Sequence, residues 1–149
     1  FKDYRASGKF LESARKNLNI GNNVLLLNHS FSHNNYGAMM VAYSMERIVE
    51  KLGYTPKTLL FKNSEHTDIF DLFKKRYLNT TDEYEMSDYG RLLKLTKSYK
   101  TFITGSDQVW RNWWNNDRLY RWFIDFADSS KNLISYAASF GFDYFDFQK

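Results

Sequence analysis

Short apolar runs separated by helical patterns constrain the fold of this chain more than any other feature of its sequence. The run Val24–Leu27 contains no polar residue, which is typical of a strand buried on both faces of a parallel sheet. Later runs predict further strands at 58–61, 101–104 and 133–137. Helical patterns lie between the first three strands, so the sequence predicts an α/β fold with a mostly parallel sheet.

The helix after the first strand has the clearest pattern in the chain. Apolar residues follow the three-and-four spacing of one helical face from Ala38 to Leu52. Asn34 or Asn35 is predicted to cap the start of this helix, and Gly53 to end it. Strand, helix and strand in this order form a βαβ unit with a right-handed crossover.

Two further helices are predicted from weaker patterns. Residues 64–79 are expected to form a helix with four apolar side chains on one side, namely Ile69, Leu72, Phe73 and Tyr77. Ser87 is predicted to cap a helix that carries Leu92, Leu93 and Leu95. Residues 80–86 fit neither a helical nor a strand pattern. Residues 111–121 are expected to form a loop with one helical turn.

The chain is predicted to consist of a lead-in segment and one domain. Residues 1–17 carry five positive and two negative side chains, a net charge of +3. A helix docked on the domain and a solvated arm both fit the lead-in segment, residues 1–21. Residues 22–149 are long enough for one domain with a core, which we expect to be Rossmann-like.

Charge and composition argue against several classes of protein. Most of the net charge of +4 lies in residues 1–17, so the body lacks the basic stripe of a nucleic-acid-binding protein. No apolar run approaches the length of a membrane span. The chain has no cysteine, which suits a cytoplasmic protein. We therefore expect a cytoplasmic location, with the inner face of the membrane as an alternative, and no nucleic-acid partner.

The stretch after the third strand carries the residues most suited to a site. Gly105 lets the chain turn with positive φ, while Ser106 and Asp107 can cap a helix or face a ligand. Local pattern alone favours a strand–turn–helix corner with a capping Asp107 and a core Trp110.

The order of the predicted elements gives this stretch a second interpretation. Ligands bind at the carboxyl ends of the strands in an open parallel sheet. The loops 28–37, 104–110 and 138–142 all leave those ends, and all are rich in small and polar residues. Their convergence favours a binding site at that edge.

Five short pieces of the chain together resemble the polysaccharide pyruvyl transferases. In chain order they are Asn35-Tyr36-Gly37-Ala38, Leu52-Gly53-Tyr54, Thr104-Gly105-Ser106-Asp107-Gln108-Val109-Trp110, Phe123-Ile124-Asp125-Phe126 and Ile134-Ser135-Tyr136-Ala137-Ala138-Ser139-Phe140-Gly141. The third and fifth pieces are the specific ones. The resemblance extends over roughly residues 22–142.

The resemblance implies an enzyme that takes pyruvate from phosphoenolpyruvate and forms a ketal or related linkage on a sugar of a surface or capsular polysaccharide. It also implies a fold like that of the two-domain GT-B glycosyltransferases, with residues 22–149 as an incomplete, acceptor-side N-terminal half. In the family, a His and Arg set for the donor lies mainly in a second domain. We therefore expect this segment alone to be inactive.

The implied ligands are a glycan or lipid-linked sugar acceptor and phosphoenolpyruvate as donor substrate, with no cofactor. A second half-domain or a homo-oligomer is the expected protein partner. Two alternatives stay open: a non-catalytic glycan-binding or interaction domain with the same fold, and the N-terminal half of another sugar transferase.

Asp107 is the candidate catalytic residue, because at the end of a strand it could orient a sugar hydroxyl or take its proton as a general base. A helix cap is the structural alternative. The substrate-binding candidates are Asn35, Tyr36, Gly37, Gly105, Ser106, Gln108, Trp110, Ser139 and Phe140. The helix start at 35–37 favours an anion, and an aromatic ring could stack on a sugar or lie in the core.

His29 and His33 stand four residues apart in the first loop. A metal pair would need a third ligand, and the sequence places none near them. We therefore expect both to be solvated loop histidines and expect no metal site.

Overall fold

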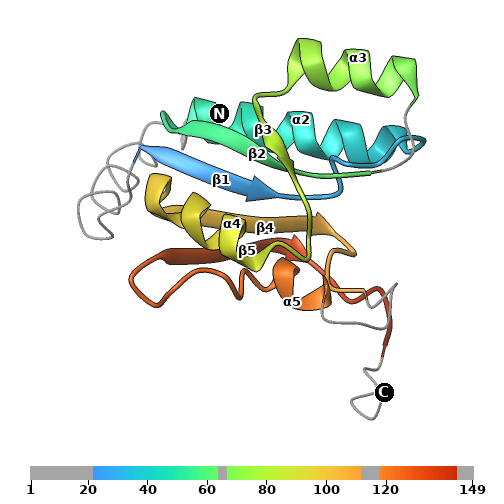
Figure 1. The fold of residues 1–149 in the computed structure, drawn as a ribbon. Coiled ribbons are helices and arrows are strands. Elements are labelled where there is room, and N and C mark those ends of the chain that lie inside the picture. The colour runs from blue at the N-terminus through green and yellow to red at the C-terminus, as the bar shows by residue number, and fades with distance from the viewer. Residues whose placement is uncertain (1–21, 64–66, 112–117, 144–149) are drawn as a thin grey trace, which may run out of the picture.

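The computed structural model describes residues 22–63, 67–111 and 118–143, and the expected lead-in segment lies outside these ranges. Five strands form one sheet in the order β3-β2-β1-β4-β5, and all neighbouring strands are parallel (Figure 1). Their bounds are β1 Asn23–Leu27, β2 Thr55–Phe61, β3 Thr80–Tyr84, β4 Thr101–Asp107 and β5 Asn132–Ala138. The predicted Rossmann-like α/β fold is confirmed, with an entirely parallel sheet.

Helices cover both faces of the sheet. Their bounds are α2 Tyr36–Lys51, α3 Asp68–Tyr77, α4 Tyr89–Leu95 and α5 Arg118–Trp122, with a 3₁₀ turn at Thr96–Ser98. Alternate residues of β1 face opposite sides, as the pleat of a strand requires. Val24 and Leu26 pack against α2, whereas Leu25 and Leu27 lie in the core cluster that includes residues of α4 and α5. The apolar run therefore forms a central strand buried on both faces.

Helix α2 begins and ends as the sequence predicts. The Oδ1 atom of Asn35 accepts a hydrogen bond from the Ala38 N–H at 3.1 Å, which caps the first turn. After the last turn, Gly53 adopts a φ of 79°. The buried face differs from the predicted one, because Ile48 is exposed and Glu46 is buried.

Two elements around β3 differ from the sequence prediction. The undecided segment 80–86 contains β3, an edge strand of the sheet. The predicted Ser87 cap of α4 is wrong, since the Oδ1 atom of Asp88 accepts a hydrogen bond from the Arg91 N–H at 3.0 Å. Asp88 stands directly before the first helical residue, where a side chain reaches that N–H group.

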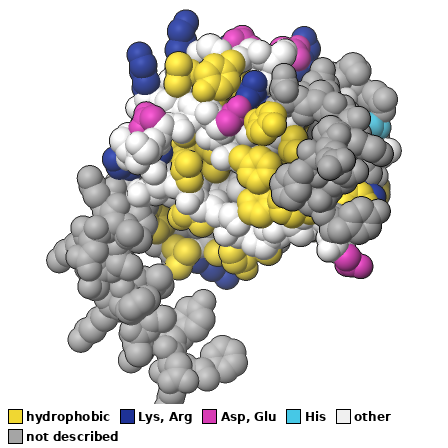
Figure 2. Space-filling view, turned by 90° about the horizontal axis from the view of Figure 1, so that it is seen from below, with side chains coloured by type: hydrophobic (Ala, Val, Ile, Leu, Met, Phe, Trp, Pro, Cys, Tyr) yellow, Lys and Arg dark blue, Asp and Glu magenta, His cyan; other side chains and the backbone are white. Residues whose placement is uncertain are grey.

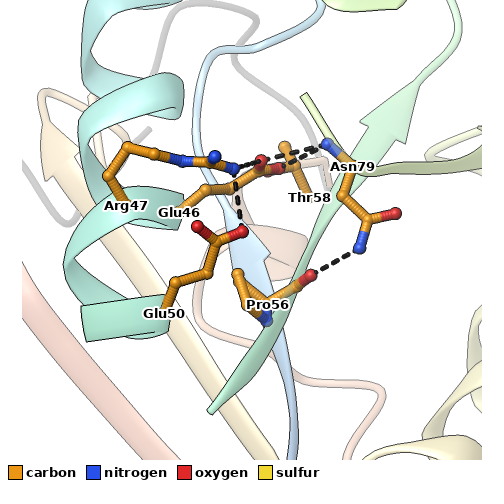
Figure 3. Close-up of polar contacts among 6 residues, drawn as sticks. All are labelled: Glu46, Arg47, Glu50, Pro56, Thr58 and Asn79. Carbon is orange, nitrogen blue, oxygen red and sulfur yellow. Dashed lines mark hydrogen bonds and ion pairs between the residues drawn. The ribbon is translucent and has the colours of Figure 1, made fainter. Parts of the chain in front are cut away.

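Glu46 joins α2 to β2 and to the residue directly before β3 through a buried carboxylate (Figure 3). Its Oε1 atom accepts a hydrogen bond from the Thr58 hydroxyl at 2.6 Å, and both oxygens accept from the Asn79 N–H at 3.0 and 3.1 Å. The Nη2 atom of Arg47 lies 3.4 Å from the Oε2 atom of Glu46. Burial raises the pKa of Glu46, and these contacts partly oppose that rise.

Replacing Glu46 with alanine is expected to lower the free energy of unfolding by about 2 kcal/mol, because the Thr58 hydroxyl and the Asn79 N–H lose their buried acceptor. Urea unfolding measures this change. The control is Glu50→Ala, which removes an exposed ion pair with Arg47 but leaves the acceptor of Thr58 and Asn79 in place, and it should cost less than about 1 kcal/mol. Equal losses in both variants would contradict a structural role for the buried carboxylate.

Strand β5 forms an open edge of the sheet. Its side chains Leu133, Ile134 and Tyr136 are 38–54% exposed. Figure 2, seen from the side on which β5 and α5 lie in Figure 1, shows hydrophobic side chains gathered on the surface. Within the described ranges no further strand pairs with β5, so this edge leaves backbone groups unpaired.

Candidate functional site

Strand β4 runs through the predicted turn. The prediction that the chain turns directly after Thr104 is wrong, because Gly105 pairs with Tyr136 and Asp107 with Ala138 in the parallel register of β4 and β5. Pairing with β5 overrides the local turn preference of Gly, Ser and Asp. The turn follows Asp107 instead. The Arg111 N–H closes this turn by donating a hydrogen bond to the Gln108 carbonyl at 3.0 Å.

Gly105 allows an unusually close approach between the two strands. Its φ is +111°, and a Cβ atom at this position would lie 2.2 Å from the carbonyl oxygen of Tyr136. Side chains do not fit at that distance and are strained at that φ. The glycine of the motif is therefore required by the packing of β4 on β5.

Asp107 ends β4 in a conformation that few side chains adopt. Its φ is 80° and its side chain is exposed. The Oδ1 atom accepts a hydrogen bond from the Gln108 N–H at 2.8 Å, so the carboxylate supports its own turn and caps none of the helices that the structure describes. Strained residues of this kind cluster at functional sites, and each costs of order 1–3 kcal/mol.

The loops after β4 and β5 are held together by backbone hydrogen bonds. The Ser139 N–H donates to the Asp107 carbonyl at 3.0 Å, and the Trp110 N–H donates to the Ser139 carbonyl at 3.1 Å. Gln108 accepts from Arg111 Nη1 at 2.8 Å. The structure thus brings together most of the candidates from the fourth and fifth strands.

Trp110 belongs to an aromatic cluster beside these loops. Its ring stacks on Phe123 with centroids 5.2 Å apart, and Phe140 lies at 5.4 Å. The indole N–H donates to the Trp122 carbonyl at 3.2 Å. Trp110 is partly buried, so it serves both the core and an aromatic surface on which a sugar ring can stack.

The candidates at the start of α2 lie in a different cluster. The side chain of Asn35 is engaged as the helix cap, and Gly37 follows in the first turn. The Tyr36 ring lies 4.8 Å from the ring of Phe70 in α3. In the described part of the chain, no hydrogen bond or ring contact joins these three candidates to Asp107.

His29 is a further candidate site residue, which the sequence analysis did not assign to the site. The prediction of a solvated loop histidine is wrong, because its ring lies partly buried at 5.2 Å from Trp122 and 5.8 Å from Phe31. Burial lowers the pKa of His29, and the nearby negative charge of Asp107 acts in the opposite direction. The other histidine, His33, is also partly buried, with Nδ1 3.1 Å from Nδ2 of an asparagine after β2.

The sequence did hold a signal for His29. Leu27 of β1 pairs with Thr104 of β4, and these strands are adjacent and parallel. His29 and Asp107 both lie a few residues beyond that pair, at the carboxyl edge. Side chains so placed meet at one end of the sheet.

Four buried polar atoms at this edge have no hydrogen-bond partner among the described residues. They are Asn28 Nδ2, His29 Nε2, Thr104 Oγ1 and Trp122 Nε1. The amide and the indole can only donate, and the hydroxyl and imidazole can donate. Such groups favour a ligand with acceptor oxygens, such as a carboxylate, phosphate or sugar.

Replacing Asp107 with asparagine is expected to lower the pKa of His29 further, because the carboxylate stabilises the charged imidazole. Proton NMR of the His29 ring during a pH titration measures this change. A pKa depressed below the ordinary value of about 6.5 makes the folded state lose stability as pH falls through and below that value. That loss should be steeper in Asp107→Asn.

The control for this titration is Asp128→Asn, which removes an exposed carboxylate that does not act on His29. It should leave the His29 titration unchanged. A His29 pKa that rises or stays constant in Asp107→Asn would show that the two side chains are not coupled.

Across the ranges that the structure describes, no group of three or more His, Asp or Glu side chains is placed to hold a metal ion. Within the same residues, no helix is both long and apolar enough to cross a membrane.

Comparison with known proteins places the chain beside a known family. A family model described as polysaccharide pyruvyl transferase matches residues 35–148, well over half of the chain. The matched range begins at the residue that caps α2 and contains Asp107 and all the substrate-binding candidates, whereas His29 lies before it. No curated protein matches the chain.

Proposed function

Because the chain belongs to the polysaccharide pyruvyl transferase family, we propose that it transfers pyruvate from phosphoenolpyruvate to a sugar of a surface or capsular polysaccharide. Membership of the family indicates a transferase with a glycan acceptor. The family match over 35–148 is the strongest support for the proposal. Phosphoenolpyruvate is the proposed donor substrate, and no separate cofactor is proposed.

The proposed reaction joins two sugar hydroxyls to one carbon. The first hydroxyl oxygen bonds to C2 of phosphoenolpyruvate while C3 takes up a proton. Inorganic phosphate then leaves C2, and the second hydroxyl oxygen bonds there and closes the ketal. Both hydroxyl protons must be removed, so a base beside the acceptor sugar accelerates the reaction.

Asp107 is the proposed base. It is exposed at the carboxyl edge of the sheet, where ligands bind in this class of fold, and its backbone is held in an uncommon conformation. Burial lowers the pKa of the neighbouring His29, which favours a neutral imidazole that can donate or accept a hydrogen bond to a sugar hydroxyl. In this proposal Asp107 removes the proton and His29 orients the hydroxyl.

The other candidates have proposed roles in binding. Ser106 and Gln108 would hydrogen-bond the sugar, and the aromatic cluster of Trp110 and Phe140 would stack on its ring. The helix start at 35–37 would attract the carboxylate or phosphate of the donor.

We also propose that residues 22–149 form the acceptor-side half of the enzyme. The exposed edge strand β5, with apolar side chains on the surface, is compatible with a second half-domain or another copy beside it. Donor contacts would then come mainly from that second half.

The test uses the full-length gene product with phosphoenolpyruvate and envelope polysaccharide prepared from the source organism after deletion of the gene. We expect inorganic phosphate to be released only when the polysaccharide is present, and the product to carry a pyruvate ketal. Phosphate release that does not depend on the polysaccharide would refute the mechanism.

Two other outcomes would replace the proposal. Binding of the polysaccharide without consumption of phosphoenolpyruvate would indicate a glycan-binding domain. Consumption of a nucleotide sugar in place of phosphoenolpyruvate would indicate another kind of sugar transferase.

A further inference from the structure

An apolar groove of about 330 Å³ lies between α2 and α3. Helix α3 packs against α2 at the outside of the molecule (Figure 1), and Phe70 is the one residue of α3 that is buried. Five large side chains that line the groove are 46–65% exposed, namely Tyr36, Met40, Ile69, Leu72 and Tyr77. Most of the apolar side of α3 therefore faces away from the protein.

Cationic side chains stand at the carboxyl end of α3, beside the groove. Lys75 and Arg76 are exposed, and neither forms an ion pair with any residue that the structure describes. Lys74 is neutralised by Asp71 at 2.8 Å, and Asp68 lies at the opposite end of the helix. The unpaired positive charge is therefore concentrated at one end of the apolar surface.

Exposed apolar side chains flanked by Lys and Arg are typical of a helix that lies in the surface of a membrane. The tyrosines at both ends of the groove fit the depth of the lipid headgroups, where aromatic rings gather. Cations beside such a surface attract anionic lipids. The exposed apolar side chains and the positive charge beside them therefore both favour an anionic membrane surface as the partner.

We propose that the groove between α2 and α3 docks on an anionic lipid bilayer. Ile69 and Leu72 enter the boundary between headgroups and acyl chains, while Lys75 and Arg76 contact lipid phosphates. The partner is a membrane surface, and the helix lies on it without crossing it. This docking does not depend on the proposed transferase activity.

The test is sedimentation of the full-length gene product with lipid vesicles. One set contains phosphatidylcholine alone, and in the other about a third of the lipid is phosphatidylglycerol. We expect binding to the anionic vesicles only, and weaker binding at high salt because exposed charges are screened. Equal binding to both sets, or binding to neither, would overturn the proposal.

Two double variants separate the charged and apolar contributions. Lys75→Glu with Arg76→Glu, and Ile69→Ser with Leu72→Ser, should each reduce the fraction bound by at least about tenfold. All four side chains are exposed, so circular dichroism spectra should match those of the unchanged protein. The charge variant keeps every apolar residue and tests the proposal even if the other variant unfolds.

The matched control is Leu93→Ser with Lys94→Glu on α4. This helix covers the opposite face of the sheet and also exposes one leucine and one lysine. The control should bind like the unchanged protein. Equal loss in the control, or concentration-dependent dimers that only the α3 variants abolish, would show that the groove does not dock on lipid.

Discussion

Replacing Asp107 with asparagine is expected to lower the turnover of the full-length enzyme by about 100-fold or more, the scale typical of a lost general base. Asparagine keeps the size of the side chain and an oxygen that accepts from the Gln108 N–H, and it tolerates positive φ better than most residues. The substitution therefore removes the charge and the basicity with little change to the turn. The initial rate of phosphate release in the presence of acceptor measures the effect.

The control for this variant is Asp82→Asn, which changes an exposed carboxylate on β3 at the far edge of the sheet. It should leave the rate unchanged. An Asp107→Asn enzyme that keeps its full rate would assign the carboxylate to the turn alone.

Replacing Gly105 with alanine is expected to destabilise the fold by at least about 3 kcal/mol. The added Cβ would lie 2.2 Å from the Tyr136 carbonyl oxygen and 3.2 Å from the Ala138 nitrogen, and both are backbone atoms that cannot rotate away. The variant also forces a side chain into a φ of +111°. Relief requires β5 to move away from β4. Urea unfolding followed by circular dichroism measures the loss.

Gly90→Ala provides the matched control. Gly90 lies in α4, and a Cβ atom added there would lie 3.9 Å from the nearest neighbouring atom. Alanine favours a helix over glycine by about 0.5–1 kcal/mol, so this variant should be as stable as the unchanged protein or more so. If Gly105→Ala unfolded at the same urea concentration as Gly90→Ala, the close approach of β4 and β5 would not be a constraint.

The sequence was sufficient to predict the elements whose hydrophobic pattern is decided locally. Val24–Leu27 is apolar throughout because β1 is central, and Asn35 can cap α2 without help from distant residues. The sequence does not decide the conformation of β3, because only Thr81 in it is buried. An edge strand of polar residues owes its conformation to its neighbour β2, which local pattern does not reveal.

The candidate site was predictable to the extent that it depends on topology. The loops after β4 and β5 meet because parallel strands end at one edge of the sheet. The contact between Asp107 and Ser139 follows from that arrangement. The direction of Tyr36 was not predictable, since its ring packs on α3. The burial of His29 was also not predictable, because the Trp122 ring that packs against it comes from a distant segment.

The central place of β1 has a consequence for the kinetics of folding. Leu26 has Thr58 as its neighbour in β2 and Ile103 as its neighbour in β4, which is much farther along the chain. The entropy lost in closing a loop grows with its length, and non-local pairing slows folding. The unit of β1, α2 and β2 is therefore expected to form first, with docking of β4 as the later step. His29 and Asp107 come together only in that later step. A chain trapped before it would therefore contain the unit of β1, α2 and β2 but no assembled site.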